Sequence, residues 1–312
     1  MRSFRVLSAY LGAVLIGGAL LAPWLYWLVD ATGLMAREGA PPFYRFISRS
    51  LQIVALLGIW PLLRSFRIDS WKAVGLQRVP DWQKQLRSGF GLGFVSLGLV
   101  GAATLISGTR VWDSHLRLTS LLFGMLGAIA GAVVVSLLEE TLFRGVIFGA
   151  FRQFNHWVTA LGISSVIYSL VHFFEKPAVG AADIKWSSGL ELLPQMLSGL
   201  ADIDRLVPAF FVLLLVGAIL GVAYQRAGSL YYSIGLHAGW IFWLKSFGIL
   251  TANHSSATTH LWGTAKMIDG WFTVLVLLPI LAWFLLSAAS DKQPLTVLLG
   301  RFANRPQDWN EA

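Results

Sequence analysis

Long apolar runs recur along this 312-residue chain, and they limit the folds that it can adopt. A helical run of about 20 apolar residues matches the hydrocarbon core of a bilayer, which is about 30 Å thick. Backbone polar groups in lipid must be hydrogen-bonded within the protein, so such runs form helices or the strands of a closed barrel. The runs here are continuous rather than alternating, which favours helices. We predict eight spans, at residues 6–29, 44–63, 88–107, 119–150, 157–174, 207–226, 230–250 and 270–288.

The composition supports this assignment. Hydrophobic residues make up 56% of the chain and charged residues only 13%, whereas a soluble domain carries about 25% charged residues. The sequence therefore predicts an all-α polytopic membrane protein with a functional site in a cavity of the helical bundle. The run at 119–150 is too long for a simple crossing, and we expect it to tilt or to emerge at the interface after Arg144.

The net charge of +8 comes from Lys and Arg residues that flank the apolar runs and do not form one stripe. This pattern is typical of juxtamembrane charge and predicts the lipid bilayer, not nucleic acid, as the partner. Six basic residues lie between 64 and 87, which favours cytoplasmic N- and C-termini. The acidic loop at 175–205 is then external. Cysteine is absent, which excludes a cysteine nucleophile, and with the short loops it favours a multi-pass protein of the cell membrane, in a bacterial inner membrane.

Glu139 and Glu140 stand side by side within the fourth apolar run, followed by Arg144. An ionised group inside a bilayer costs at least about 2.5–3.5 kcal/mol, so it marks a candidate functional site. On a helix, Glu140 and Arg144 are four residues apart and can form an ion pair. Glu139 is turned by about 100° from Glu140 and lacks that partner. We therefore predict that Glu139 is reactive and that Glu140 and Arg144 support it; the alternative is an ordinary buried ion-pair network.

His172 and His237 each lie within a later apolar run. The polar stretch at 152–157 links the fourth and fifth spans, and Glu139 and His172 are equally far from it. In an antiparallel hairpin they should face each other, about 24 Å of helix from the turn. His237 follows a second turn, near 226–229, by about nine residues, or about 13 Å of helix. The other four histidines fall in loops, where a surface position is expected.

One carboxylate and two imidazoles can activate water in two ways, and the residues leave both open. Glu139 and His172 can polarise the water directly while His237 stabilises the oxyanion. Alternatively Glu139, His172 and His237 can bind a divalent metal such as zinc, although no HExxH motif is present. A GxSxG serine elbow is also absent. The glycine-rich patches at 89–94 and 124–131 indicate close helix packing.

Three motifs in order resemble the CAAX-protease and bacteriocin-processing (CPBP) family of intramembrane peptidases, which includes the type II CAAX prenyl proteases. EETLFR at 139–144 is similar to its EExxxR motif. YSLVH at 168–172 is similar to its FxxxH motif, with Tyr168 in place of Phe. HAGWI at 237–241 is similar to its third motif, with Ile241 where Asn or Asp is usual.

The resemblance implies an all-helical membrane peptidase that cleaves a membrane-associated peptide or a lipidated protein. Glu139 and His172 would activate water and His237 would stabilise the oxyanion. We divide the chain into N-terminal spans with a basic loop (1–118), a CPBP-like catalytic core (119–250), and a last span with a tail (251–312).

Three functional hypotheses remain. The first is an intramembrane endopeptidase, and the second is a non-enzymatic immunity or scaffolding protein of the same fold. The third, a transporter with a protonatable glutamate, would call for broken helices in matched halves, and the sequence contains no such pairing.

Overall fold

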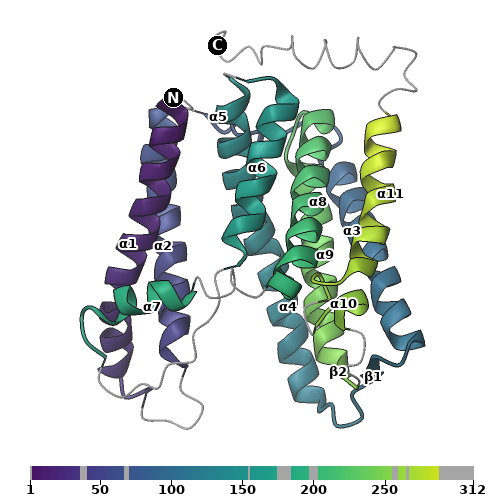
Figure 1. Cartoon of the computed structure of the whole chain (residues 1–312), viewed down its shortest axis with the longest axis horizontal. Coiled ribbons are helices and arrows are strands. Elements are labelled where there is room, and N and C mark those ends of the chain that lie inside the picture. The colour runs from purple at the N-terminus through teal and green to yellow at the C-terminus, as the bar shows by residue number, and fades with distance from the viewer. Residues whose placement is uncertain are drawn as a thin grey trace. The chain divides into compact units, whose positions relative to one another are not determined.

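A computed structural model describes residues 2–35, 41–66, 70–153, 155–173, 184–196, 203–254, 259–264 and 267–287, and its helices are drawn in Figure 1. Helices form nearly all of the described structure. Their bounds are α1 Arg2–Asp30, α2 Phe43–Ser65, α3 Trp82–Ile106, α4 Leu118–Glu140, the π-helix η1 Thr141–Phe148, α5 Gly149–Arg152, α6 Trp157–Val171, α7 Ser188–Met196, α8 Ile203–Ala227, α9 Tyr231–Leu250, α10 Thr259–Trp262 and α11 Trp271–Ser287. Two short strands, β1 Arg110–Trp112 and β2 Thr251–Asn253, pair antiparallel.

Each of the eight predicted spans coincides with a helix, and the prediction of an all-α polytopic membrane protein is confirmed. Among the described residues, five helices are long and apolar enough to cross a membrane, and α6 and α11 are shorter apolar helices. The five are Arg5–Asp30, Phe43–Ser65, Trp82–Ile106, Leu118–Arg152 and Leu206–Ala227. The fourth is unbroken over 35 residues because α4, η1 and α5 follow one another without a gap.

Two short helices, α7 and α10, were not predicted, because neither carries an apolar run of bilayer length. Helix α7 lies within the loop that was expected to be external. Much of that loop, and the tail beyond residue 287, lies outside the described residues.

The chain divides into two compact units. The first takes in residues 1–69 and 173–203 and contains α1, α2 and α7. Helix α1 packs along α2, and α7 lies against α1, where the backbone of Gly189 approaches the carbonyl of Ala19. Its core includes Phe43, Ile47 and Met196.

The second unit takes in residues 70–172 and 204–312, and its closest helix pair is α3 with α9. A Cβ at Gly93 would overlap the carbonyl oxygen of Leu236, and a Cβ at Gly239 would overlap that of Phe90. Gly89 and Gly235 make the same kind of backbone approach from the two sides. Small residues spaced four apart on both helices therefore let the backbones touch, as was expected for the patch at 89–94.

Side-chain hydrogen bonds of Arg110 join β1, which follows α3, to β2, which follows α9. Arg110 in β1 is buried and donates from Nε to the Thr251 hydroxyl and from Nη2 to the Thr251 carbonyl, both at 2.8 Å. Its Nη1 donates to the Asn253 side chain, also at 2.8 Å. Burial lowers the pKa of the Arg110 guanidinium. These hydrogen bonds fix the C-terminal end of α9, the helix that carries His237.

Candidate active site

The two glutamates end the α-helical part of the long fourth helix. Glu139 and Glu140 are the last residues of α4, and Arg144 lies in the π-helix η1 that follows. Wide π-turns are rare and occur frequently at functional sites. The ion pair expected between Glu140 and Arg144 is present, with Nη1 3.0 Å from Oε1 and with side chains 0% and 1% exposed.

The buried ion pair has further partners from other helices. His237 on α9 places Nδ1 2.8 Å from the same Glu140 oxygen. Arg144 also donates from Nη2 to the carbonyl of Gly217 on α8 at 3.3 Å, and its guanidinium carbon lies 4.5 Å from the centre of the Tyr168 ring. A buried charge is tolerated only when it is paired and hydrogen-bonded. Glu140 therefore joins α4, η1 and α9 through one carboxylate oxygen.

Glu139 has a different environment from its neighbour. Its side chain is 28% exposed, yet its Oε2 atom is buried and forms no hydrogen bond with the described residues. This oxygen lies 3.8 Å from Nε2 of His172 and 3.8 Å from Nε2 of His237. The structure thus brings together the three groups that the sequence singled out, and it places Glu139 and His172 at the same height across the α4–α6 hairpin.

Hydrogen bonds define the tautomers of both histidines. Nδ1 of His172 lies 2.7 Å from the carbonyl oxygen of Tyr168, which can only accept, so Nδ1 carries the proton. Nδ1 of His237 faces the Glu140 carboxylate in the same way. In the neutral imidazoles, both Nε2 atoms therefore turn a lone pair toward Glu139. Three acceptors facing one another form a site for a hydrogen-bond donor such as water.

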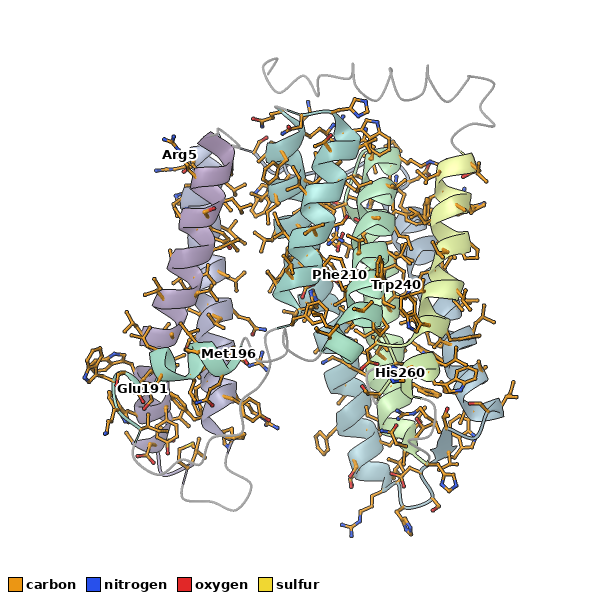
Figure 2. All side chains as sticks on the ribbon, viewed as in Figure 1. Arg5, Glu191, Met196, Phe210, Trp240 and His260 are labelled. Atoms are coloured by element: carbon orange, nitrogen blue, oxygen red, sulfur yellow. The ribbon has the colours of Figure 1, made fainter. Side chains whose placement is uncertain are left out.

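These groups line a cavity of about 130 Å³. Tyr168 and Trp240 also line it, and Trp240, labelled in Figure 2, donates from Nε1 to the Ser96 hydroxyl at 2.8 Å. Most of the remaining wall is apolar and comes from several helices, and includes Leu97, Val135, Val212, Ile241 and Leu277. A water needs only about 10–15 Å³ of such space, so the cavity has room for water and part of a substrate.

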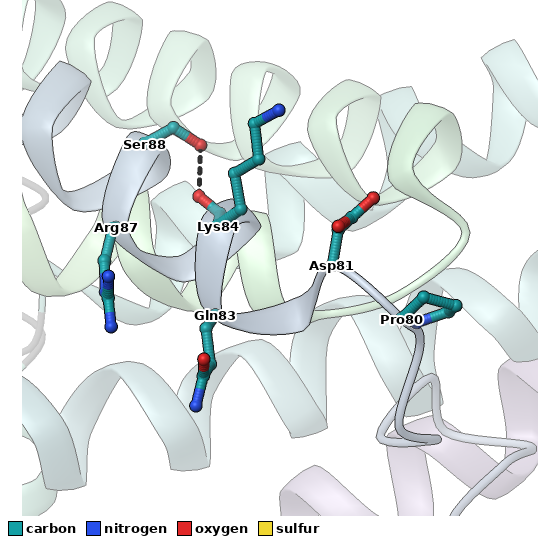
Figure 3. Close-up of a pocket in the computed structure, with 6 residues that line it drawn as sticks. All are labelled: Pro80, Asp81, Gln83, Lys84, Arg87 and Ser88. Atoms are coloured by element: carbon teal, nitrogen blue, oxygen red, sulfur yellow. Dashed lines mark hydrogen bonds between the residues drawn. The ribbon is translucent and has the colours of Figure 1, made fainter.

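A wider depression lies at the start of α3, away from this chemistry. It measures about 520 Å³ and is open, and Figure 3 shows its lining. Ser88 donates to the carbonyl of Lys84 at 2.6 Å there. Its described lining residues include no histidine, so they lack the acid–imidazole combination of the smaller cavity. The lining residues are Pro80, Asp81, Gln83, Lys84, Arg87 and Ser88.

The predicted metal-ligand set of Glu139, His172 and His237 does not fit a metal ion as it stands. Across the described ranges, no group of three or more His, Cys, Asp or Glu side chains is placed to hold one. Ligand atoms of a tetrahedral zinc, at bond lengths of about 2.0–2.2 Å, lie about 3.3–3.6 Å apart, whereas the carboxylate oxygen here is 3.8 Å from each imidazole nitrogen.

One group that the sequence reasoning missed is the Tyr168 hydroxyl. It lies 3.5 Å from Nε2 of His237 in the interior, with the residue only 2% exposed. The motif comparison marked Tyr168 only as a substitution for another aromatic residue. Its position four residues before His172 was the available signal, because such a pair shares one helix face.

The remaining histidines lie away from the cavity. His156 precedes α6 and accepts from the backbone of Val158, and His115, His254 and His260 are exposed. The surface positions expected for them agree with these placements.

Comparison with known proteins gives one finding. Residues 119–243 match the family described as type II CAAX prenyl endopeptidase Rce1-like. No curated protein and no solved structure matches the chain. The match spans all three motif segments, at 139–144, 168–172 and 237–241, and it confirms the resemblance drawn from them. Residues 119–243 of this multi-pass membrane protein are therefore similar to the family described as type II CAAX prenyl endopeptidase Rce1-like.

Proposed function

We propose that the protein is an intramembrane endopeptidase that hydrolyses a peptide bond of a membrane-associated or lipidated substrate. One observation carries this proposal. Oε2 of Glu139 lies 3.8 Å from Nε2 of His172 and from Nε2 of His237, in a cavity with apolar walls. The gaps are too long for direct hydrogen bonds, whose usual limit is about 3.2 Å, but a water molecule can bridge them.

In the proposed reaction, Glu139 is the general base. A water held by Glu139 and by Nε2 of His172 gives a proton to the carboxylate as its oxygen attacks the carbonyl carbon. The π electrons of the carbonyl move to its oxygen and form a tetrahedral oxyanion. When the C–N bond breaks, the leaving amine takes the proton from Glu139, which returns to a carboxylate.

The buried Glu140 and Arg144 position these groups. Glu140 orients His237 through Nδ1, and Arg144 neutralises Glu140. His237 can stabilise the oxyanion through Nε2 when the ring is protonated, because only the imidazolium carries a proton there.

The alternative is a non-enzymatic scaffolding or immunity protein that keeps the polar cluster for helix association. The buried Glu140–Arg144 pair, with His237 on the same carboxylate oxygen, would serve that role equally well. Glu139 argues against it, because its side chain is 28% exposed in the cavity and Oε2 lies 3.8 Å from each imidazole nitrogen, too far to bond the helices together directly.

The test is cleavage by purified protein in proteoliposomes. The probe is a pool of fluorogenic peptides tethered to the bilayer, with and without a prenylated cysteine, and mass spectrometry identifies the products. Glu139→Gln and His172→Ala should lower the cleavage rate by about 10²–10⁴-fold, the range of general acid–base catalysis. His260→Ala, a change at an exposed histidine, is the matched control and should cleave at the wild-type rate.

The result also separates the two hypotheses. Both variants should keep the wild-type unfolding temperature in detergent if the residues serve chemistry. Cleavage that persists in both variants would contradict the peptidase proposal, and a large loss of thermal stability in both would support the scaffolding role.

A further inference from the structure

The described part of the cavity holds few groups that can donate a hydrogen bond to a reacting carbonyl. The indole of Trp240 already donates to Ser96 at 2.8 Å. The hydroxyl of Thr273, which also lines the cavity, already donates to the carbonyl of Met267 at 2.7 Å. Both imidazoles commit their Nδ1 protons elsewhere. In their neutral forms, His172 and His237 therefore offer only lone pairs to the cavity.

The Tyr168 hydroxyl is the neutral donor that remains among these lining groups. It lies 3.5 Å from Nε2 of His237, at the weak end of hydrogen bonding, and it also interacts with the Glu139 carboxylate. A hydroxyl proton rotates freely about the C–O bond, so it can turn to the oxyanion, which becomes the stronger acceptor once Glu139 has taken the proton from water.

The ring of Tyr168 is held in place, so its hydroxyl is aimed in advance. The Arg144 guanidinium carbon lies 4.5 Å from the ring centre, and the Phe143 ring packs edge-on with centroids 5.0 Å apart. The residue is 2% exposed. A fixed donor stabilises the developing charge without reorganising during the reaction. This preorganisation is why oxyanion stabilisation lowers the activation free energy so much.

We propose that Tyr168 is a catalytic residue that donates its hydroxyl hydrogen bond to the oxyanion of the tetrahedral intermediate; this rests on the peptidase function proposed above. The hydroxyl keeps its proton throughout. As water oxygen bonds to the carbonyl carbon and its proton passes to Glu139, the carbonyl π electrons become the oxyanion that Tyr168 contacts. The contact ends when the C–N bond breaks, the carbonyl re-forms and the amine takes the proton from Glu139.

The first variant is Tyr168→Phe, which removes one oxygen and keeps the ring on Arg144 and Phe143. Loss of a single oxyanion donor lowers kcat by about 10²–10³-fold, so we expect a fall of that order with KM and the unfolding temperature unchanged. The assay is the proteoliposome cleavage of the tethered peptide pool.

A second variant places a hydrogen-bond donor for the oxyanion on a different helix that lines the cavity. Ile241 lines the cavity one helical turn beyond His237. Adding Ile241→Asn to Tyr168→Phe supplies a side-chain amide donor, and we expect it to raise kcat at least about tenfold over Tyr168→Phe alone.

The outcomes distinguish this proposal from the function on which it rests. Cleavage that depends on Glu139 but stays within threefold of wild type in Tyr168→Phe overturns the role of Tyr168 and leaves the peptidase proposal standing. If Tyr168→Phe lowers the unfolding temperature clearly as well as kcat, the role of Tyr168 is structural and the proposal is also overturned. Absence of Glu139-dependent cleavage in the wild type overturns both.

Discussion

Two neighbouring glutamates, Glu139 and Glu140, lie in different environments, and we propose that this difference gives them different roles. Glu140 is 0% exposed and shares one oxygen between Arg144 and His237. Glu139 is 28% exposed and turns an unbonded oxygen to the two imidazoles. A rotation of about 100° between successive helical residues is enough to direct one carboxylate into the packing and the other into the cavity.

Glu140→Gln tests this division by stability. The amide keeps the shape of the side chain but leaves Arg144 as a buried charge without its counter-ion. Breaking a buried pair in this way costs about 3–5 kcal/mol, and we expect a clear fall in the unfolding temperature in detergent. The matched variant Glu139→Gln should change the unfolding free energy by less than about 1 kcal/mol, since Oε2 has no hydrogen-bond partner among the described residues and the side chain is partly exposed. Equal effects of the two changes would contradict the division of roles.

At the scale of the elements, the position of α9 is set by its close contact with α3. His237 lies between Gly235 and Gly239, and both glycines meet the α3 backbone. Gly89 and Gly93 of α3 in turn lie against the α9 backbone. The backbone approach therefore sets the position from which His237 reaches Glu140 and Glu139.

Gly93→Ala should force the two helices apart. Its Cβ would overlap the Leu236 carbonyl, a rigid backbone atom, and overpacking of this kind costs about 1–3 kcal/mol. We expect a lower unfolding temperature and slower cleavage, as His237 moves with α9. Gly91→Ala is the matched control, because nothing lies within 4 Å of a Cβ there. It should be neutral or stabilising by up to about 1 kcal/mol from helix propensity. A destabilising Gly91→Ala with a neutral Gly93→Ala would refute the packing argument.

At the scale of the whole molecule, the chain crosses the membrane several times, and its orientation is a prediction from charge. Basic residues cluster between 64 and 87, which favours the cytoplasmic side for that loop and for both termini. The segment between α3 and α4 should then face the opposite side.

Cysteine labelling measures this orientation directly, because the chain contains no cysteine that would give a background. Single substitutions Gln83→Cys and Ser114→Cys place thiols at exposed positions in the two segments. A membrane-impermeant maleimide should label Ser114→Cys in intact cells and Gln83→Cys only after permeabilisation. The reverse pattern would invert the proposed topology.

Local rules predicted much of this protein from its sequence. Apolar runs that match the thickness of the bilayer predicted the positions of the helices. The periodicity of the α-helix predicted the ion pair between Glu140 and Arg144. Equal distances from the connecting turn predicted that Glu139 and His172 would meet. Each of these inferences uses contacts within one helix or one hairpin.

Only the tertiary structure decided the rest. The bond from His237 to Glu140, the Gly217 carbonyl on Arg144 and the hydroxyl of Tyr168 beside His237 join helices that are far apart in the chain. They depend on how far each helix is rotated about its axis and how closely α3 and α9 approach. Hydropathy leaves rotation undetermined in a helix that is apolar on all sides, so these contacts follow from the packing of all the helices together.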